Sequence, residues 1–177
     1  MHFELQPHLQ GELVELRPLA PDDWRDLFAV ASDPLIWAQH PASDRYQEPV
    51  FRAFFQEALD CGGAFAIIDR GTGRIIGSTR YHAVEGDADA IEIGWTFLAR
   101  SHWGGRYNHE MKRLMLDHAF KFVERVIFVV GEHNIRSQTA VQRIGGVRPP
   151  GKDGFIDKPN RHGQIIRNFR YVIHKHK

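Results

Sequence analysis

Apolar residues recur along the first third of the chain with two different periods. Residues 11–19 alternate apolar and polar side chains, which predicts an opening strand. The spacing then becomes that of a helix, first after Pro21 and again after residue 50. Residues 32–48 lie between these two helices and have two prolines and no clean period, so we expect a loop there. The helical positions are Trp24, Leu27, Phe28 and Ala31 in the first helix, and Phe51, Phe54, Phe55, Ala58 and Leu59 in the second.

The middle of the chain changes to strands. Three apolar runs, at 64–69, 75–84 and 90–98, are joined by short glycine-containing turns and predict an antiparallel meander. A long helix, a buried strand at 125–130, a helix from Asn134 to about Ile144 and a last strand at 165–173 should follow. The helical positions of the long helix are Tyr107, Met111, Leu114, Met115, His118 and Phe122. This order predicts an α/β protein with one mixed sheet and helices on both faces.

Length and composition limit the classes of protein to consider. The 177 residues with 42% hydrophobic content suit one domain, residues 1–177. Lys and Arg number 23 against 22 Asp and Glu, so no overall field favours nucleic acid or a membrane surface as a partner. The single cysteine, Cys61, excludes an internal disulfide framework and a cysteine-rich metal site, and we expect no metal. The start has no signal-peptide pattern and the apolar runs are short, so the expected location is the cytoplasm.

Candidate chemistry lies between the fourth predicted strand and the long helix. Gly104 and Gly105 directly precede this helix. In such an arrangement the free backbone N–H groups and the helix dipole point at a bound anion, which makes it suitable for phosphate. Two glycines before a helix are also an ordinary turn, and they are not specific by themselves.

Several segments in order resemble one family over nearly the whole chain. The segments ELRPLAPDDW, IEIGW, WGGRYN and HNIRSQTAVQRIGG are similar to those of the GNAT superfamily of N-acetyltransferases, nearest to the RimJ and RimL branch. The resemblance implies a three-layer fold. Its central, mostly antiparallel sheet would have six to seven strands and a splay between the fourth and fifth strands, 90–98 and 125–130. It also implies direct transfer of an acetyl group from acetyl-CoA, the co-substrate, to a primary amine in a ternary complex.

The resemblance also assigns roles to residues. The pantetheine arm would bind along Trp95, Thr96 and Phe97, and Asn134 and Ser137 would contact pantetheine and the CoA sulfur. The pyrophosphate loop falls on Trp103, Gly104, Gly105, Arg106, Tyr107 and Asn108. Arg106 and Asn108 depart from the family pattern, which has Gly, and Gly or Ala, at these positions. Arg106 could bind a phosphate, crowd it or point into solvent. Asn134 and Ser137 could also form an ordinary helix start.

The remaining catalytic groups are less specific. Ser137 is the candidate acid for the departing thiolate, and Glu92 is the first candidate for the general base, with His82 the second. Each of these two residues could instead have no catalytic role. Glu92 could face solvent or a neighbouring strand, and a lone histidine in a strand is usually structural. Cys61 stands at a helix end and does not suggest an acyl-cysteine route.

The leading hypothesis is thus an acetyl-CoA-dependent enzyme. The alternatives are a CoA-binding regulatory module without turnover and a nucleotide-phosphate binder that shares only the glycine turn. The acceptor could be a protein N-terminus, a polyamine, an aminoglycoside or an amino-acid-like metabolite. Its pocket should come from residues 32–48 and 149–164, where Trp37, His40 and Tyr46 are available. The sequence leaves the oligomeric state open, a homodimer included.

Overall fold

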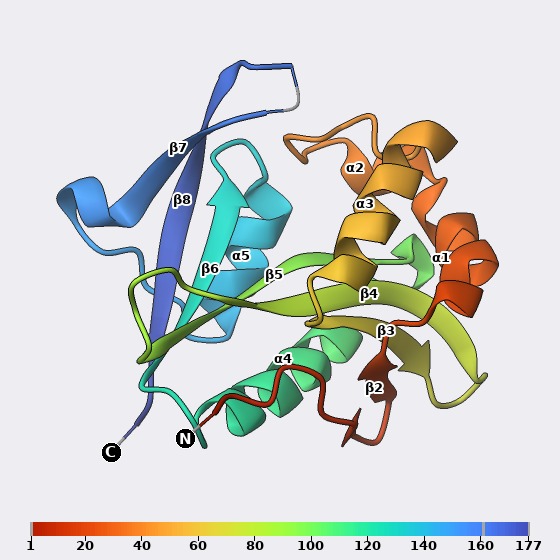
Figure 1. Ribbon diagram of the computed structural model, residues 1–177, viewed down its shortest axis with the longest axis horizontal. Helices are drawn as coiled ribbons and strands as arrows, with labels where there is room; N and C mark the ends of the chain where they lie inside the picture. Colours follow the sequence, from red (N-terminus) through yellow and green to blue (C-terminus); the bar gives the residue numbers. More distant parts are fainter. Residues whose placement is uncertain (1, 161, 177) are drawn as a thin grey trace.

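The computed structural model describes residues 2–160 and 162–176, which form one eight-stranded sheet with helices on both faces (Figure 1). The strand order is β1-β2-β3-β4-β5-β6-β8-β7. Every neighbouring pair is antiparallel except β5 and β6, which are parallel. The strands are β1 Leu9–Gln10, β2 Val14–Pro18, β3 Ala64–Asp69, β4 Arg74–Ala83, β5 Ala90–Leu98, β6 Arg125–Gly131, β7 Phe155–Pro159 and β8 Ile165–His174.

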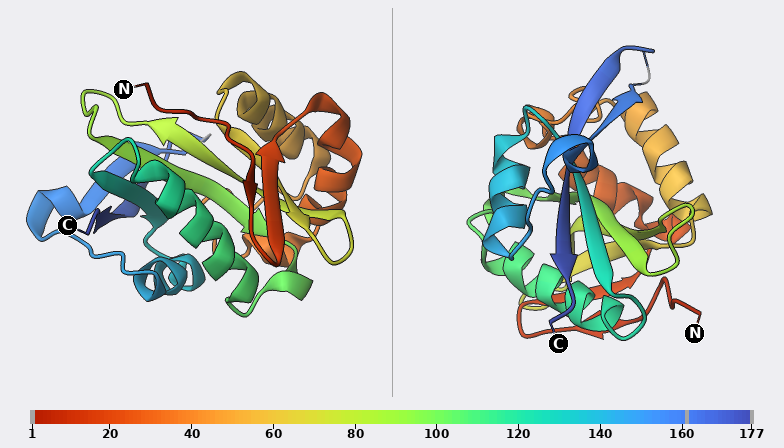
Figure 2. Two further views of the ribbon diagram at one scale, coloured as in Figure 1. Left: turned by 90° about the horizontal axis from the view of Figure 1, so that it is seen from below. Right: turned by 90° about the vertical axis from the view of Figure 1, so that its left-hand side faces the viewer.

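The helices divide into two groups that cover opposite faces of the sheet, as Figure 2 shows. The first group packs on one face through an aromatic cluster that includes Trp37, Phe51 and Phe97. The second group packs on the other face, where Met111 and Met115 join the apolar side chains of the strands. The first group is α1 Trp24–Ala31, α2 Pro34–Trp37 and α3 Glu48–Asp60, and the second is α4 Arg106–Ala119 and α5 Ile135–Arg143. The three-layer prediction is confirmed.

The sheet opens between β5 and β6. These strands pair only at Ala90 with Arg125, Ile91 with Val126 and Glu92 with Ile127. Beyond Glu92, β5 continues beside β4, whereas β6 continues beside β8 through Gly131. The expected splay between the fourth and fifth predicted strands is therefore present, and the facing edges of β5 and β6 beyond it are unpaired.

A bulge in β5 lies next to this opening. Ser78 of β4 pairs with Phe97 and Arg80 pairs with Gly94, so Thr79 stands opposite two residues, Trp95 and Thr96. Trp95 has a φ of 51°, and it is the one non-glycine residue among those described with a positive φ. A bulky side chain in this region of backbone space is uncommon, and bulges bend a strand and leave a residue unpaired.

Three details of the predicted fold were wrong. The sheet has eight strands, and six to seven were expected, because β1 and β7 were missed. Strand β7 lies in the expected loop 149–164 and is mostly exposed at an edge, so it has no apolar alternation to predict it. Likewise, 32–48 is not all loop, since it contains α2. That helix is a single turn, capped by the Asp33 side chain and started by Pro34, and is too short to show a period.

Candidate active site

The splay opens into a cleft of about 1660 Å³. It is lined by β5, β6, the first turns of α4 and α5, the segment 36–45 and residues from the β7–β8 hairpin. Pockets for single small molecules usually enclose about 300–1,000 Å³. This cleft is larger, so it has room for a long ligand together with a second molecule.

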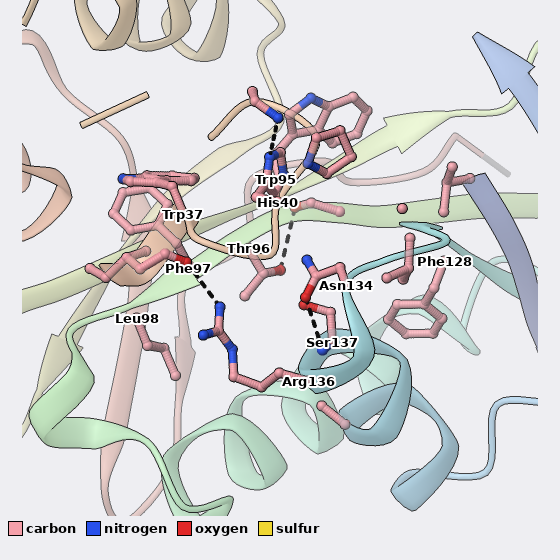
Figure 3. A pocket seen from close by; sticks show the side chains of 18 of the residues that line it. Trp37, His40, Trp95, Thr96, Phe97, Leu98, Phe128, Asn134, Arg136 and Ser137 are labelled. Atoms are coloured by element: carbon pink, nitrogen blue, oxygen red, sulfur yellow. Dashed lines mark hydrogen bonds between the residues drawn. The ribbon is translucent and has the colours of Figure 1, made fainter. Parts of the chain in front are cut away.

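Three predicted residues lie on one wall of the cleft, at the bulge of β5. Trp95, Thr96 and Phe97 all line it, and Figure 3 shows them facing Asn134 and Ser137 across the opening. Because a bulged residue has no partner on the neighbouring strand, its backbone groups are available to a ligand. The predicted pantetheine-binding strand is thus at the cleft wall.

The predicted phosphate loop leads straight into α4. Gly104 and Gly105 both have a φ of 105°, and Gly105 is the N-cap residue. No heavy atom of the described residues lies within 4 Å of a Cβ built at either glycine, so their backbone faces open space. The first N–H groups of a 14-residue helix have no intrahelical partner, and the residues at this helix start line the cleft. This is a suitable place for an anion.

The other four loop residues differ in their placement. Trp103 lines the cleft, and its indole Nε1 donates a hydrogen bond to the carbonyl oxygen of Leu98 at 3.0 Å. Arg106, the first residue of α4, is exposed at the cleft, and Asn108 also lines it. Tyr107 does not line it. Its ring packs against the core 4.7 Å from the ring of His102, so its side chain is not placed to contact a ligand there.

Asn134 and Ser137 are brought together at the start of α5. Asn134 is buried, and its Oδ1 accepts a hydrogen bond from the backbone N–H of Ser137 at 3.3 Å (Figure 3). This is the helix-capping arrangement that was one of the two interpretations of the pair. Both residues also line the cleft. Capping therefore does not remove them from the site.

Basic groups line the cleft. Besides the N-terminus of α4, they include four arginines: Arg106, Arg113, Arg136 and Arg143. The guanidinium of Arg136 lies 3.8 Å from the ring centroid of Trp103 and donates to the carbonyl oxygen of Ile36 (Figure 3). Cations and helix N–H groups around one opening attract a polyanionic ligand.

Glu92 lies in the cleft, whereas His82 is not among the residues that line it. Burial raises the pKa of Glu92, against the effect of Lys158, His82, Arg170 and Arg80. A raised pKa makes a carboxylate a stronger base. His82 is exposed and stands opposite Glu92 on β4. Of the two candidate bases, Glu92 is the one placed at the site.

Lys112 of α4 is a buried cleft residue that sequence reasoning missed. It is 4% exposed, and its Nζ donates a hydrogen bond to Oγ1 of Thr96 at 2.7 Å. Thr96 Oγ1 lies in turn 2.8 Å from Oγ1 of Thr79. No carboxylate among residues 2–160 and 162–176 forms an ion pair with Lys112, and burial lowers its pKa to about 7. The available signal was its position on the buried stripe of α4, three residues before Met115.

Glu110, also missed, ties the start of α4 to the N-terminal segment. Its carboxylate accepts hydrogen bonds from the backbone N–H groups of Glu12, Leu13 and Val14 at 2.9, 2.7 and 2.8 Å. Burial acts to raise its pKa, but the three hydrogen bonds outweigh it and the pKa is lowered. The charged side chain therefore holds the first turns of α4 against the N-terminal segment.

A splayed sheet, a bulged strand and a basic, glycine-preceded helix start are together typical of transferases that take a nucleotide-linked thioester. The comparison with protein families agrees. Residues 14–147 match the model of the acetyltransferase (GNAT) domain, and the chain belongs to this family. Membership implies the use of acetyl-CoA as the donor. None of the described helices is long and apolar enough to cross a membrane.

Solved structures with this fold cover nearly the whole chain. A provisionally assigned acetyltransferase from T. thermophilus is 27% identical, with a TM-score of 0.79, over 98% of this chain and 92% of that one. The GNAT-family acetyltransferase of Bacillus anthracis is 22% identical, with a TM-score of 0.77, over 95% and 98%. Mycobacterium smegmatis RimJ in complex with CoA-disulfide is 17% identical, with a TM-score of 0.66, over 91% and 81%. The expected likeness to the RimJ branch holds for the fold. No curated protein matches the sequence significantly.

Proposed function

We propose that this protein is an N-acetyltransferase that moves the acetyl group of acetyl-CoA directly to a primary amine while both are bound. The observation that carries the proposal is the convergence on one cleft of three features. These are the bulge at Trp95 and Thr96, the glycine-preceded start of α4 and the capped Asn134–Ser137 turn. The family match and the RimJ complex with a CoA derivative support it.

The donor would lie along the splay. Its pyrophosphate would be bound by the N–H groups that follow Gly104 and Gly105, with Arg106 as a further partner. The pantetheine arm carries amide groups, which need hydrogen-bond partners when they leave water. The unpaired edges of β5 and β6 beyond Glu92 and Ile127 supply such partners. In this pose the thioester would lie near the bulge.

The transfer needs a polarised carbonyl and two proton movements. A backbone N–H of the bulge would polarise the thioester carbonyl, and Lys112 would hold Thr96 in position beside it. The neutral amine attacks the carbonyl carbon, the C–S bond breaks, and the Ser137 hydroxyl protonates the departing thiolate and regains a proton from solvent. Glu92 accepts the proton lost by the amine, directly or through water. Most of the rate enhancement would come from positioning the two substrates.

The scope of the proposal is the whole chain. We propose that residues 1–177 form one domain, because the sheet draws strands from both ends of the described chain. The competing function is a CoA-binding module without turnover. It is favoured by one observation, the exposed Arg106 where the family pattern has glycine.

Two measurements distinguish these functions. Acetyl-CoA at 100 times its dissociation constant should stabilise the protein by about 2.7 kcal/mol, seen as a rise in melting temperature. Dephospho-CoA, which lacks the 3′-phosphate, should raise it less. Free thiol should then appear when acetyl-CoA and an amine panel are added together. Stabilisation without thiol release from any amine would favour the module, and no stabilisation at millimolar acetyl-CoA would refute both functions.

A further inference from the structure

Two arginines lie at or behind the wall of the cleft, the half-buried Arg45 and the buried Arg80. Arg45 lines the cleft, and its guanidinium carbon lies 4.3 Å from the ring centroid of Phe54 and 5.2 Å from that of Trp37. The two rings hold one side of the guanidinium without using its N–H groups. Among the described residues, no hydrogen bond or ion pair occupies these groups. They are therefore available to a ligand in the cleft.

Arg80 adds a second positive charge behind the aromatic wall. It is 2% exposed, and its guanidinium carbon lies 4.6 Å from the ring centroid of Trp95 and 5.2 Å from that of Phe54. Its Nη1 lies 3.3 Å from Oε1 of Glu57, and its buried Nη2 has no partner in the described part of the chain. A buried arginine is normally paired with a carboxylate on most of its N–H groups, because desolvating it is costly. Here the carboxylate in contact, that of Glu57, belongs to a side chain that is 65% exposed.

Other charged groups of both signs lie nearby. Lys158 and His162 add two basic side chains from the hairpin, and Asp44 lies 3.9 Å from His162. His40 is neutral, since burial, together with Arg45 and Arg136, lowers its pKa to about 3. Among the described residues, no carboxylate forms an ion pair with the guanidinium of Arg45, so its positive charge can attract an anion in the cleft.

We propose, on the basis of the acetyltransferase function above, that the acceptor is a small amine that also carries a carboxylate, and that Arg45 binds this carboxylate. Guanidinium groups bind carboxylates through two parallel N–H donors, which fixes orientation as well as affinity. Trp37, Phe54 and Trp95 form apolar walls suited to a hydrocarbon or aromatic body between the two groups. Polyamines and aminoglycosides would instead bring additional positive charge to Arg45 and Arg80, which disfavours them.

The test compares amines that differ only in the carboxylate. Phenylalanine and phenylalanine amide form one pair, and 4-aminobutyrate and 4-aminobutyramide form another with a longer spacing. Spermidine represents the polycationic acceptors. With wild-type enzyme the acid of at least one pair should have a kcat/KM about tenfold above that of its amide. In Arg45→Gln the acid and its amide should have about equal kcat/KM. In Arg45→Lys the preference should be intermediate, because the positive charge is kept but the two parallel N–H donors of the guanidinium are lost.

Arg52→Gln is the matched control, because it removes the same charge from α3. Arg52 is exposed, stacks on Trp24 and pairs with Glu48, and it does not line the cleft. Its carboxylate preference should equal that of the wild type. The proposal is overturned if the amides or spermidine are preferred, or if the preference persists unchanged in Arg45→Gln.

Calorimetric titration of each amine into CoA-saturated protein separates this proposal from the function on which it rests. Tighter binding of the acid in the wild type, lost in Arg45→Gln, without any acetyl transfer, would support the carboxylate site and refute the enzyme. Acetyl transfer without a carboxylate preference would support the enzyme and refute the site. If Arg45→Gln does not fold, the wild-type pairs and Arg45→Lys test the site by the same criteria.

Discussion

Replacing Lys112 by methionine should make the protein more stable and less active. Lys112 is 4% exposed and has no carboxylate partner among the described residues, so its ammonium form is desolvated in the folded state and solvated in the unfolded state. Methionine, like lysine, has an unbranched side chain, and it carries no charge that must be desolvated on folding. In exchange, Thr96 loses the hydrogen bond from Nζ, which should reduce kcat by disturbing the bulge. Gains in stability at the expense of activity are common at functional sites.

The size of the gain follows from the pKa of this group. Lowering it from 10.5 to about 7 penalises the charged form by roughly 4 to 5 kcal/mol, at about 1.36 kcal/mol per pKa unit. The lost hydrogen bond to Thr96 offsets about 1 kcal/mol of this. At pH 7 and below, where the unfolded state is protonated, Lys112→Met should therefore be more stable by about 3 to 4 kcal/mol. Between pH 7 and 10.5 the unfolded state binds more protons than the folded state, so wild-type stability rises and the advantage shrinks.

Urea unfolding of both proteins at several pH values from about 6 to about 9.5 measures this difference in the free energy of unfolding. All other titrating groups are the same in the two proteins, so their contributions cancel in the comparison. Lys121→Met removes an exposed lysine just beyond α4 and should give a difference close to zero at every pH. If Lys112→Met is less stable than the wild type at pH 7, or if the difference does not change with pH, then Lys112 is not an unpaired buried amine.

Three further predictions concern the cleft. Ser137→Ala should lower kcat by about 10²-fold or more and leave acetyl-CoA affinity nearly unchanged, because its hydroxyl would protonate the thiolate; an unchanged kcat would leave it as a helix-start residue alone. Arg106→Ala should weaken acetyl-CoA binding about threefold to tenfold, more at low salt, whereas tighter calorimetric binding in both Arg106→Ala and Arg106→Gly would mean that the side chain blocks the loop. Glu110→Gln should destabilise the protein by about 1.5–3 kcal/mol at pH 7, because the charge-assisted bonds are lost. Since the pKa of Glu110 is lowered in the folded state, this difference should shrink in unfolding measurements as the pH falls below 4.5, and a constant difference would contradict it.

The parts of the fold that were predictable are those with a long buried pattern. Strands β3, β4 and β5, the buried strand β6 and helix α4 each bury a regular set of apolar side chains, and periodicity identified them. Helix α5 buries only Val141 and was identified by the residues at its two ends. Strand β7 is formed by backbone pairing with β8 and has little apolar signal of its own. The splay is a property of how two strands diverge, which no local pattern encodes, and it came from the family resemblance.

The candidate site divides in the same way. The glycines at 104 and 105 and the pair Asn134 and Ser137 have local signatures, because a helix start needs particular residues. Lys112 and Arg80 are buried, and Arg45 is half-buried, beside segments that are distant in the sequence. A lysine or arginine in a sequence is by default a solvated surface group. Only the packed structure distinguishes these three from the other basic residues.

The bonds of Glu110 bear on how much of the chain the folded domain needs. Two of its three N–H donors, those of Glu12 and Leu13, precede the segment 14–147 that matches the family, and β8 lies after it. β8 pairs with β6 along all of Arg125–Gly131. A chain trimmed to 14–147 would keep every residue of the phosphate loop and of the Asn134–Ser137 turn. It would nevertheless leave a buried carboxylate short of donors and turn an internal strand into an open, aggregation-prone edge. The segment that matches the family carries the glycine turn and the start of α5, and the flanking residues on both sides complete the cleft, satisfy its buried charge and cover its open edge.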